Sequence, residues 1–162
     1  MPSMQAVIMS RTGGPEVLEV LSLPVPELPS PRHLRVRLHA AGINPVDTKL
    51  RANGSYYPDK LPTILGCDGA GVVEAVGDKV TRFLPGDKVY FCSGGIGGEP
   101  GNYATYNSVH EDYVARMPAN LDFSAAAAVP LVLITAWEAL YDPAQLKPAE
   151  RVLIHAAAVG FG

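Results

Sequence analysis

The segment Asn44-Pro-Val-Asp47 contains the first side chains that could take part in chemistry. An asparagine amide both donates and accepts hydrogen bonds, so Asn44 could contact a carboxamide or a quinone oxygen. An Asn-Pro pair also forms turns in which the asparagine caps its own backbone. In an arbitrary sequence the turn is the better interpretation. The choice between the two depends on the pattern that surrounds the segment.

Two glycine-rich segments could approach a phosphate. Residues 151–155 form a short apolar run that leads through small residues to Gly160 and Gly162. A buried parallel strand enters a phosphate-binding turn in this way. The segment Ser93–Gly98 is also rich in glycine, but it lacks the Lys-Ser/Thr ending of a phosphate loop, so we interpret it as a flexible loop.

The elements that must position these residues are mostly strands. In His33–His39, apolar residues alternate with charged or polar ones, which is the period of a half-buried strand. Similar short strands are predicted at 5–9, 17–23, 71–76, 88–91 and 110–117. Strands of this length and spacing are typical of a barrel or a sandwich.

The composition changes after Pro118, where helices are predicted. Asp122 or Ser124 can cap a short helix over 125–129, and Pro130 suits the first position of a second helix that runs to about Tyr141. With the apolar strand predicted at 151–155, this alternation begins an α/β domain. We therefore expect a mainly β fold with some α, followed by an incomplete α/β unit.

Composition excludes several classes of protein. The chain has 162 residues, 48% hydrophobic and 18% charged, and a net charge of -3 with no basic cluster. A nucleic-acid or anionic-lipid partner is therefore not expected. Two cysteines are too few for a disulfide scaffold, and neither a signal peptide nor a membrane-spanning stretch is predicted. These features favour a cytoplasmic protein.

Five motifs in order give the chain a family resemblance. It resembles the medium-chain dehydrogenase/reductase superfamily, and within it the zinc-free NADPH:quinone oxidoreductase branch. The resemblance implies a GroES-like, partly open β-barrel over 1–122 and the start of a Rossmann cofactor-binding domain over 123–162. The motifs are Gly14-Pro-Glu-Val-Leu18, Ala41-Gly-Ile-Asn-Pro-Val-Asp47, Gly66-Cys-Asp-Gly-Ala-Gly-Val-Val73, Pro85-Gly-Asp-Lys-Val89 and Ile134-Thr-Ala-Trp137.

The same resemblance implies roles for individual residues. It places Asn44 in the cleft beside the nicotinamide and the substrate, and one of Tyr56 and Tyr57 near the cofactor as a hydrogen-bond or proton donor. Thr135 matches a helix threonine on the nicotinamide side, although a mid-helix threonine can simply bond back to a carbonyl one turn earlier. Cys67 falls at a cofactor-side position.

The terminal glycines, Gly160 and Gly162, match the phosphate-binding turn of the family. Val159 stands where relatives have a glycine, and glycine is needed there for close approach to a pyrophosphate. The helix and second strand that complete a dinucleotide site are not in the chain, so we expect the 162 residues alone to bind NADPH weakly.

Zinc-dependent relatives hold a catalytic zinc through three protein ligands. By motif position these correspond to Asn44, Cys67 and Leu131, of which only the cysteine can ligate. Two cysteines in total also exclude a four-cysteine structural zinc lobe. A zinc alcohol dehydrogenase is therefore rejected, and Cys67 is better interpreted as a small buried hydrophobic residue than as a metal ligand.

The resulting hypothesis is an NADPH-dependent, zinc-independent reductase of a quinone or a conjugated carbonyl, with a homodimer expected. The alternative is a non-catalytic GroES-like binding or assembly module. One structural expectation accompanies both. An isolated apolar strand at 152–155 is a liability in solution, so it should pair with another copy, pack on the barrel or be disordered.

Overall fold

The computed structural model describes residues 2–57 and 60–155. In this part of the chain, strands outnumber helices. The strands are β1 (Ser3–Met9), β2 (Leu18–Pro24), β3 (His33–Ala41), β4 (Thr63–Ile64), β5 (Asp68–Val76), β6 (Lys88–Cys92), β7 (Tyr106–His110) and β8 (Val114–Arg116). The helices are α1 (Pro45–Asn53), α2 (Phe123–Ala127) and α3 (Pro130–Tyr141), with 3-10 turns η1 (Pro15–Val17) and η3 (Glu111–Tyr113).

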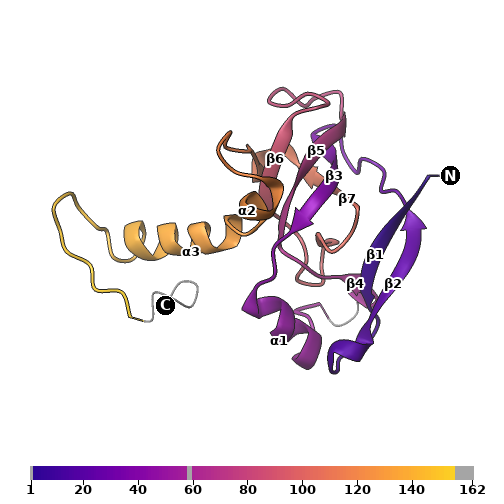
Figure 1. The fold of residues 1–162 in the computed structure, drawn as a ribbon, viewed down its shortest axis with the longest axis horizontal. Coiled ribbons are helices and arrows are strands. Elements are labelled where there is room, and N and C mark those ends of the chain that lie inside the picture. The colour runs from indigo at the N-terminus through magenta and orange to yellow at the C-terminus, as the bar shows by residue number, and fades with distance from the viewer. Residues whose placement is uncertain (1, 58–59, 156–162) are drawn as a thin grey trace.

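The strands form two antiparallel sheets in the orders β2-β1-β4 and β7-β3-β5-β6-β8. An isolated bridge between Ala6 and Ala104 links β1 to the segment before β7. The two sheets lie side by side without closing into one ring (Figure 1). This arrangement confirms the predicted mainly β, partly open barrel.

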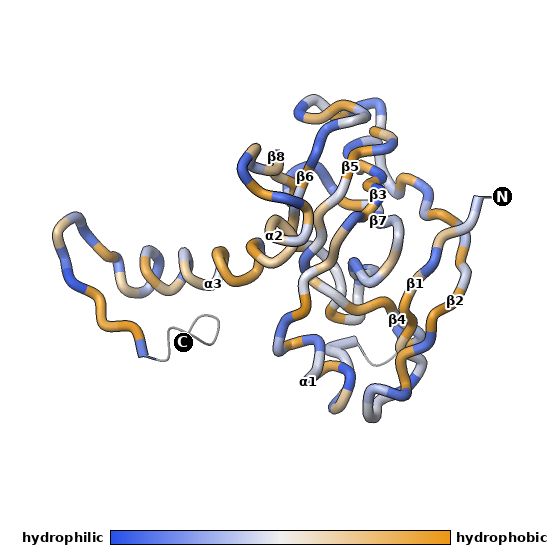
Figure 2. The backbone as a smooth tube through the Cα atoms, viewed as in Figure 1, coloured by the Kyte–Doolittle hydropathy of each residue, from blue (hydrophilic) through white to orange (hydrophobic). Residues whose placement is uncertain are grey.

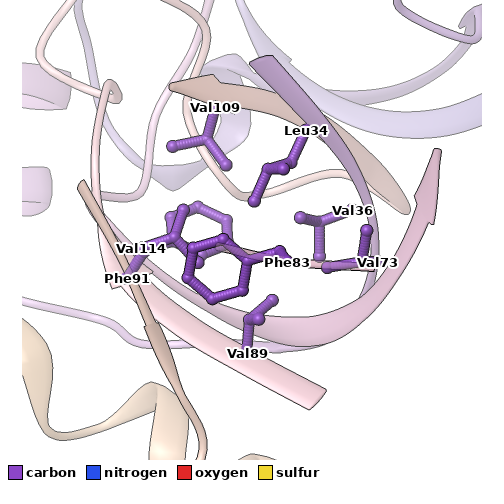
Figure 3. Close-up of a cluster of buried hydrophobic side chains, with 8 residues drawn as sticks. All are labelled: Leu34, Val36, Val73, Phe83, Val89, Phe91, Val109 and Val114. Carbon is purple, nitrogen blue, oxygen red and sulfur yellow. The ribbon is translucent and has the colours of Figure 1, made fainter. Parts of the chain in front are cut away.

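The main hydrophobic core lies between the strands of the larger sheet and the loop before β6. Leu34 and Val36 of β3 are fully buried, as the alternation in His33–His39 predicts. They face Phe83 and Phe91, whose rings fill the middle of the cluster (Figure 3). Burial of each side chain of this size contributes about 1.5–3 kcal/mol, so this cluster holds the sheet that positions the site.

Helix α1 begins inside the Asn-Pro-Val-Asp segment, at Pro45, and was not predicted. Pro45 occupies the first helical position, where its missing N–H costs nothing, and Asn44 is the N-cap. Asp47 accepts a hydrogen bond from the Asn44 N–H, as the third residue of a capping box does. The signal for a helix start was therefore present in the sequence, but Asn44 was selected for a role in the cleft and no helix was predicted after it.

Helices α2 and α3 confirm the predicted change of structure after Pro118. Asp122, rather than Ser124, is the N-cap of α2, and its Oδ1 accepts from Ala125 N at 2.7 Å. Helix α2 starts two residues earlier than predicted and packs against β5 and β3. Helix α3 begins at Pro130 and ends at Tyr141, as predicted.

Two strand predictions were wrong. The segment predicted as one strand over 110–117 contains the end of β7, the turn η3 and β8, because Glu111 turns inward there and interrupts the pairing. Residues 151–154 have no regular secondary structure and are exposed, Leu153 by 81%. No strand of the described residues lies beside this segment, and an extended segment without a partner cannot form a ladder.

Helix α3 leads away from the two sheets, and only its beginning contacts them, near β6 (Figure 1). Apolar residues lie on α3 and on the segment that follows its C-terminal loop (Figure 2). Leu133 is 57% exposed and Trp137 is 64% exposed. In the described part of the chain no helix has both the length and the apolar character needed to cross a membrane.

Candidate functional site

Asn44 lies at the N-terminus of α1, where the chain leaves β3. Its side chain is buried, and its Nδ2 donates to Asp68 Oδ2 at 2.9 Å. Its backbone N–H donates to Asp47 Oδ2 at 2.7 Å. The structure therefore fixes Asn44 through both its backbone and its side chain: Asn44 is the N-cap residue of α1, and its side-chain nitrogen bonds to Asp68.

Asp47 connects α1 to two neighbouring loops. Its carboxylate is buried, with Oδ1 accepting from Gly66 N at 3.2 Å and Oδ2 accepting from the Tyr103 hydroxyl at 2.9 Å. Burial and the bond to Asp47 raise the pKa of Tyr103 well above its usual range. The raised pKa keeps the Tyr103 phenol protonated, so it can donate to Asp47 as the structure shows.

Asp68 begins β5 and is almost fully buried, with 1% exposure. Its Oδ2 accepts from Asn44 Nδ2, and its Oδ1 accepts from Leu131 N at 3.0 Å, in the first turn of α3. Burial raises the pKa of Asp68, while the bonds from Asn44 and Leu131 act in the opposite direction. One carboxylate thus joins the start of α1 to the start of α3.

Thr135 lies one turn further along α3 and is exposed. Its Oγ1 donates to Leu131 O at 2.9 Å, so the back-bonding interpretation of this threonine is confirmed. The bond commits the hydroxyl proton to the helix and leaves the oxygen lone pairs facing away from it. The Leu131 backbone therefore links the two residues: its N–H donates to Asp68, and its carbonyl accepts from Thr135.

Cys67 is buried at 4% exposure beside Asp68. Burial raises the pKa of the Cys67 thiol to about 11. It also raises the pKa of Cys92, which pairs with Asp68 across β5 and β6, to about 12. Both side chains are therefore neutral thiols at ordinary pH. This supports the interpretation of Cys67 as a small buried hydrophobic residue.

Tyr56 and Tyr57 follow α1 on an exposed loop, with 71% and 47% exposure. The Tyr57 ring lies against Gly98, at the edge of a pocket of about 330 Å³ that Lys60 and Ile96 also line. Neither phenol forms a hydrogen bond with Asn44 in the structure. Gly160 and Gly162 lie outside the described residues.

The polar cluster contains residues that the sequence reasoning did not select, namely Asp47, Asp68 and Tyr103. For Asp68 a signal existed, because a lone acid within the apolar, glycine-rich stretch Gly66–Val73 is bound to be buried with the strand. Asp47 was also detectable as the third residue of a capping box. Nothing local in the sequence links Tyr103 to Asp47, because 56 positions separate them.

The positions that correspond to zinc ligands in zinc-dependent relatives lie around Asp68. Asn44 and the Leu131 backbone both donate to its carboxylate, and Cys67 precedes it in the chain. Within residues 2–57 and 60–155, no three His, Cys, Asp or Glu side chains gather in a way that could hold a metal ion. The centre of this site is a hydrogen-bonded carboxylate.

Comparison with known proteins gives first a class and then a family. The alcohol dehydrogenase GroES-like domain matches residues 30–119, more than half of the chain. Over 93% of this chain, the sequence is 43% identical to a quinone oxidoreductase of Pseudomonas aeruginosa. The solved quinone oxidoreductase of Coxiella burnetii is 34% identical and superposes with a TM-score of 0.86 over 97% of this chain. The chain therefore belongs to the medium-chain dehydrogenase/reductase superfamily.

A mycobacterial protein solved in complex with NADPH is also similar, with 32% identity and a TM-score of 0.78 over 95% of this chain. The matches cover 44% of the Pseudomonas protein, 50% of the Coxiella protein and 46% of the mycobacterial protein. The chain thus spans about half the length of the relatives it matches.

Proposed function

We propose that this chain is the catalytic-domain part of an NADPH-dependent, zinc-independent oxidoreductase that reduces a quinone or a conjugated carbonyl. The observation that supports this most is the hydrogen-bonded connection from Asn44 through Asp68 and Leu131 to Thr135. It holds two residues with a proposed nicotinamide role in one fixed unit. The relatives named quinone oxidoreductases supply the substrate class.

The residues present fit a nicotinamide. Thr135 has its proton committed to Leu131 O, so its oxygen can accept an N–H from a carboxamide. Asn44 is held at the N-terminus of α1, and its amide nitrogen donates to Asp68. When bound, NADPH supplies the hydride. Fixed dipoles of this kind act on a developing charge without the cost of reorganising water.

For the proton and the acceptor oxygen, we propose one of Tyr56 and Tyr57. Both are exposed on the loop after α1, so they are accessible to a substrate. A phenol at this position would donate to the oxyanion that forms as the quinone or enone takes up hydride, and water is the alternative proton source.

Zinc independence is proposed from the residue types at the three aligned positions. Asn44 and Leu131 lack the thiolate or imidazole groups that zinc needs, and both already donate to Asp68. We also propose the division into a GroES-like domain over 1–122 and the start of a Rossmann domain over 123–162. A homodimer and a cytoplasmic location complete the proposal.

The test joins this chain at Gly162 to the cofactor-binding half of the Pseudomonas aeruginosa relative and follows NADPH oxidation with a quinone. Turnover that resists a chelator is expected, and replacement of Thr135 by Val should raise the KM for NADPH about tenfold, the loss of one hydrogen bond of about 1.4 kcal/mol. Thr48 provides a matched control. Its hydroxyl also bonds back to a helix carbonyl, Pro45 O, on an exposed face of α1, so Thr48→Val should leave KM unchanged.

Each alternative gives a different result. A folded chimera that neither binds NADPH nor oxidises it with any quinone or enone would support the non-catalytic GroES-like module instead. Turnover that disappears with chelator and returns with zinc would contradict the zinc-independent mechanism. Equal effects of Thr135→Val and Thr48→Val would remove Thr135 from the cofactor site.

A further inference from the structure

We propose that Asp68 is a positioning residue for Asn44, which sets the orientation of the amide and couples it to the first turn of α3. This inference rests on the proposed role of Asn44 in the nicotinamide site. Asp68 itself is almost fully buried and bonds to the Asn44 side chain. It therefore acts through another residue.

The carboxylate is shared between two elements. One oxygen accepts from the Asn44 side chain at 2.9 Å, and the other accepts from the Leu131 backbone at 3.0 Å. A carboxylate has only acceptor oxygens, so the Asn44 amide must turn its nitrogen toward it. Without this partner the amide could rotate by half a turn at little cost, exchanging its donor and acceptor ends.

The surroundings of Asp68 lack a counter-charge. In the described part of the chain no Lys, Arg or His side chain forms an ion pair with it, and its partners there are the neutral N–H groups of Asn44 and Leu131 and the thiol of Cys92. Burial of a carboxylate without a cation is costly, and an apolar residue would fill the same space more cheaply. The cost is explained if the acid has a task that an apolar residue cannot perform.

The packing around Asp68 also holds it in place. A methyl group on Gly42 would lie 2.9 Å from the Asp68 Cβ and would overlap the Ala127 carbonyl of α2. Gly42 N donates to Asp68 O at 3.1 Å. Strand β3, strand β5 and helix α2 therefore meet at this residue, so its carboxylate has a fixed direction toward both Asn44 and Leu131.

The test is Asp68→Asn in the 162-residue chain, followed by nuclear magnetic resonance of the Asn44 side-chain NH2 and the Leu131 amide. The introduced amide has one acceptor oxygen where the carboxylate has two, so one donor must lose its partner. Rotation of one side chain disturbs less than displacement of a helix. We therefore expect the Asn44 NH2 signals to move and the Leu131 amide to keep its position. Asp122→Asn, the same change at the N-cap of α2, should move neither.

The kinetic readout uses the chimera described above. Asp68→Asn should lower kcat by about 10- to 100-fold, as small displacements of a positioned group do, with little change in the KM for quinone. Asp68→Glu keeps two acceptor oxygens and should restore part of kcat and of the Asn44 signal. This variant also serves if Asp68→Asn does not fold.

Three results would overturn the inference: unmoved Asn44 signals in Asp68→Asn, a kcat equal to that of the parent chimera, or a loss in Asp68→Glu as large as in Asp68→Asn. A parent chimera that does not bind NADPH contradicts the proposed function. The resonance experiment needs no cofactor, so it still decides whether Asp68 orients Asn44.

Discussion

The hydrogen bond from Tyr103 to Asp47 joins a loop to a helix that lies 56 positions away in the sequence. Asp47 also accepts from Asn44 N and Gly66 N, so it connects three segments around the site. At the scale of single residues, the cluster is therefore a set of neutral donors arranged around two buried carboxylates.

Replacement of Tyr103 by Phe should destabilise the fold by about 1–3 kcal/mol, because it leaves a buried carboxylate oxygen with one donor fewer. Urea unfolding monitored by circular dichroism measures the loss. Tyr106→Phe is the matched control, since the Tyr106 hydroxyl has no hydrogen bond within residues 2–57 and 60–155, and its effect should stay within about 0.5 kcal/mol. Equal losses in both variants would show that the phenol of Tyr103 is not a structural partner of Asp47.

At the scale of elements, β3 and β5 form the frame from which the site residues project. Their pairing contains irregularities at Arg35/Val36 and at Leu38/Ala40, and β3 ends just before the Gly42–Asn44 segment. The turn η3 holds the opposite end of the same sheet. There the buried Glu111 accepts from Arg32 Nε at 3.0 Å, from Thr81 N at 3.2 Å and from Arg82 N at 3.3 Å.

Glu111 makes the stability of this sheet depend on pH. Burial tends to raise its pKa, but the bonds from Arg32, Thr81 and Arg82 outweigh burial, so the pKa lies below the usual glutamate value of 4.5. A lowered carboxyl pKa stabilises the fold above the unfolded-state value, and the stabilisation is lost as the pH falls through the folded-state pKa. The free energy of unfolding should therefore decrease below about pH 4.5.

Glu111→Gln should reduce stability at pH 7 and flatten this acid dependence, measured by urea unfolding across pH 3–7. Glu74→Gln is the control. Glu74 pairs with Arg35 at the surface with 40% exposure, and pairs of this kind contribute at most about 1 kcal/mol. An acid dependence in Glu111→Gln as steep as in the parent would show that another carboxyl group is responsible.

Sequence patterns predict local elements, but they do not predict the distant partners on which some elements and the site depend. The alternation in β3, the proline at the start of α3 and the order of the motifs were sufficient to predict strands, a helix and the fold class. Residues 151–155 match a strand pattern equally well, yet they form none, because a strand depends on a partner that a pattern cannot supply. The same limit applies to the site, where Asn44 was selected but its partner Asp68 was not.

At the scale of the whole molecule, the described chain has a packed part and a projecting part. Helix α2 lies between them, with Ala126 and Ala127 buried against Ala70 of β5. Helix α3 contacts the sheet only near its start, and residues 143–155 are almost all exposed. The proposed boundary between 122 and 123 therefore falls just before the helix that joins the two parts.

This arrangement predicts different outcomes for two shortened chains. Among the described residues, a chain that ends at Asp142 loses exposed residues, the half-buried Leu146 and local bonds such as Leu146 N to Leu140 O, so its free energy of unfolding should change by less than about 0.5 kcal/mol. A chain that ends at Asp122 loses the buried face of α2 and the Leu131 donor to Asp68, and should lose roughly 2 kcal/mol or more.

Urea unfolding of the two shortened chains and the full chain shows whether α2 and the start of α3 stabilise the barrel over 1–122 or only connect it to the following residues. Equal stability of all three would mean that the barrel over 1–122 needs nothing from α2, and that the Leu131 bond to Asp68 adds nothing to the fold. A loss confined to the chain that ends at Asp122 would show that the barrel is completed by the first helix of the next domain. The barrel and the start of the cofactor-binding domain would then share one buried carboxylate, Asp68, as the contact through which the position of α3 is set.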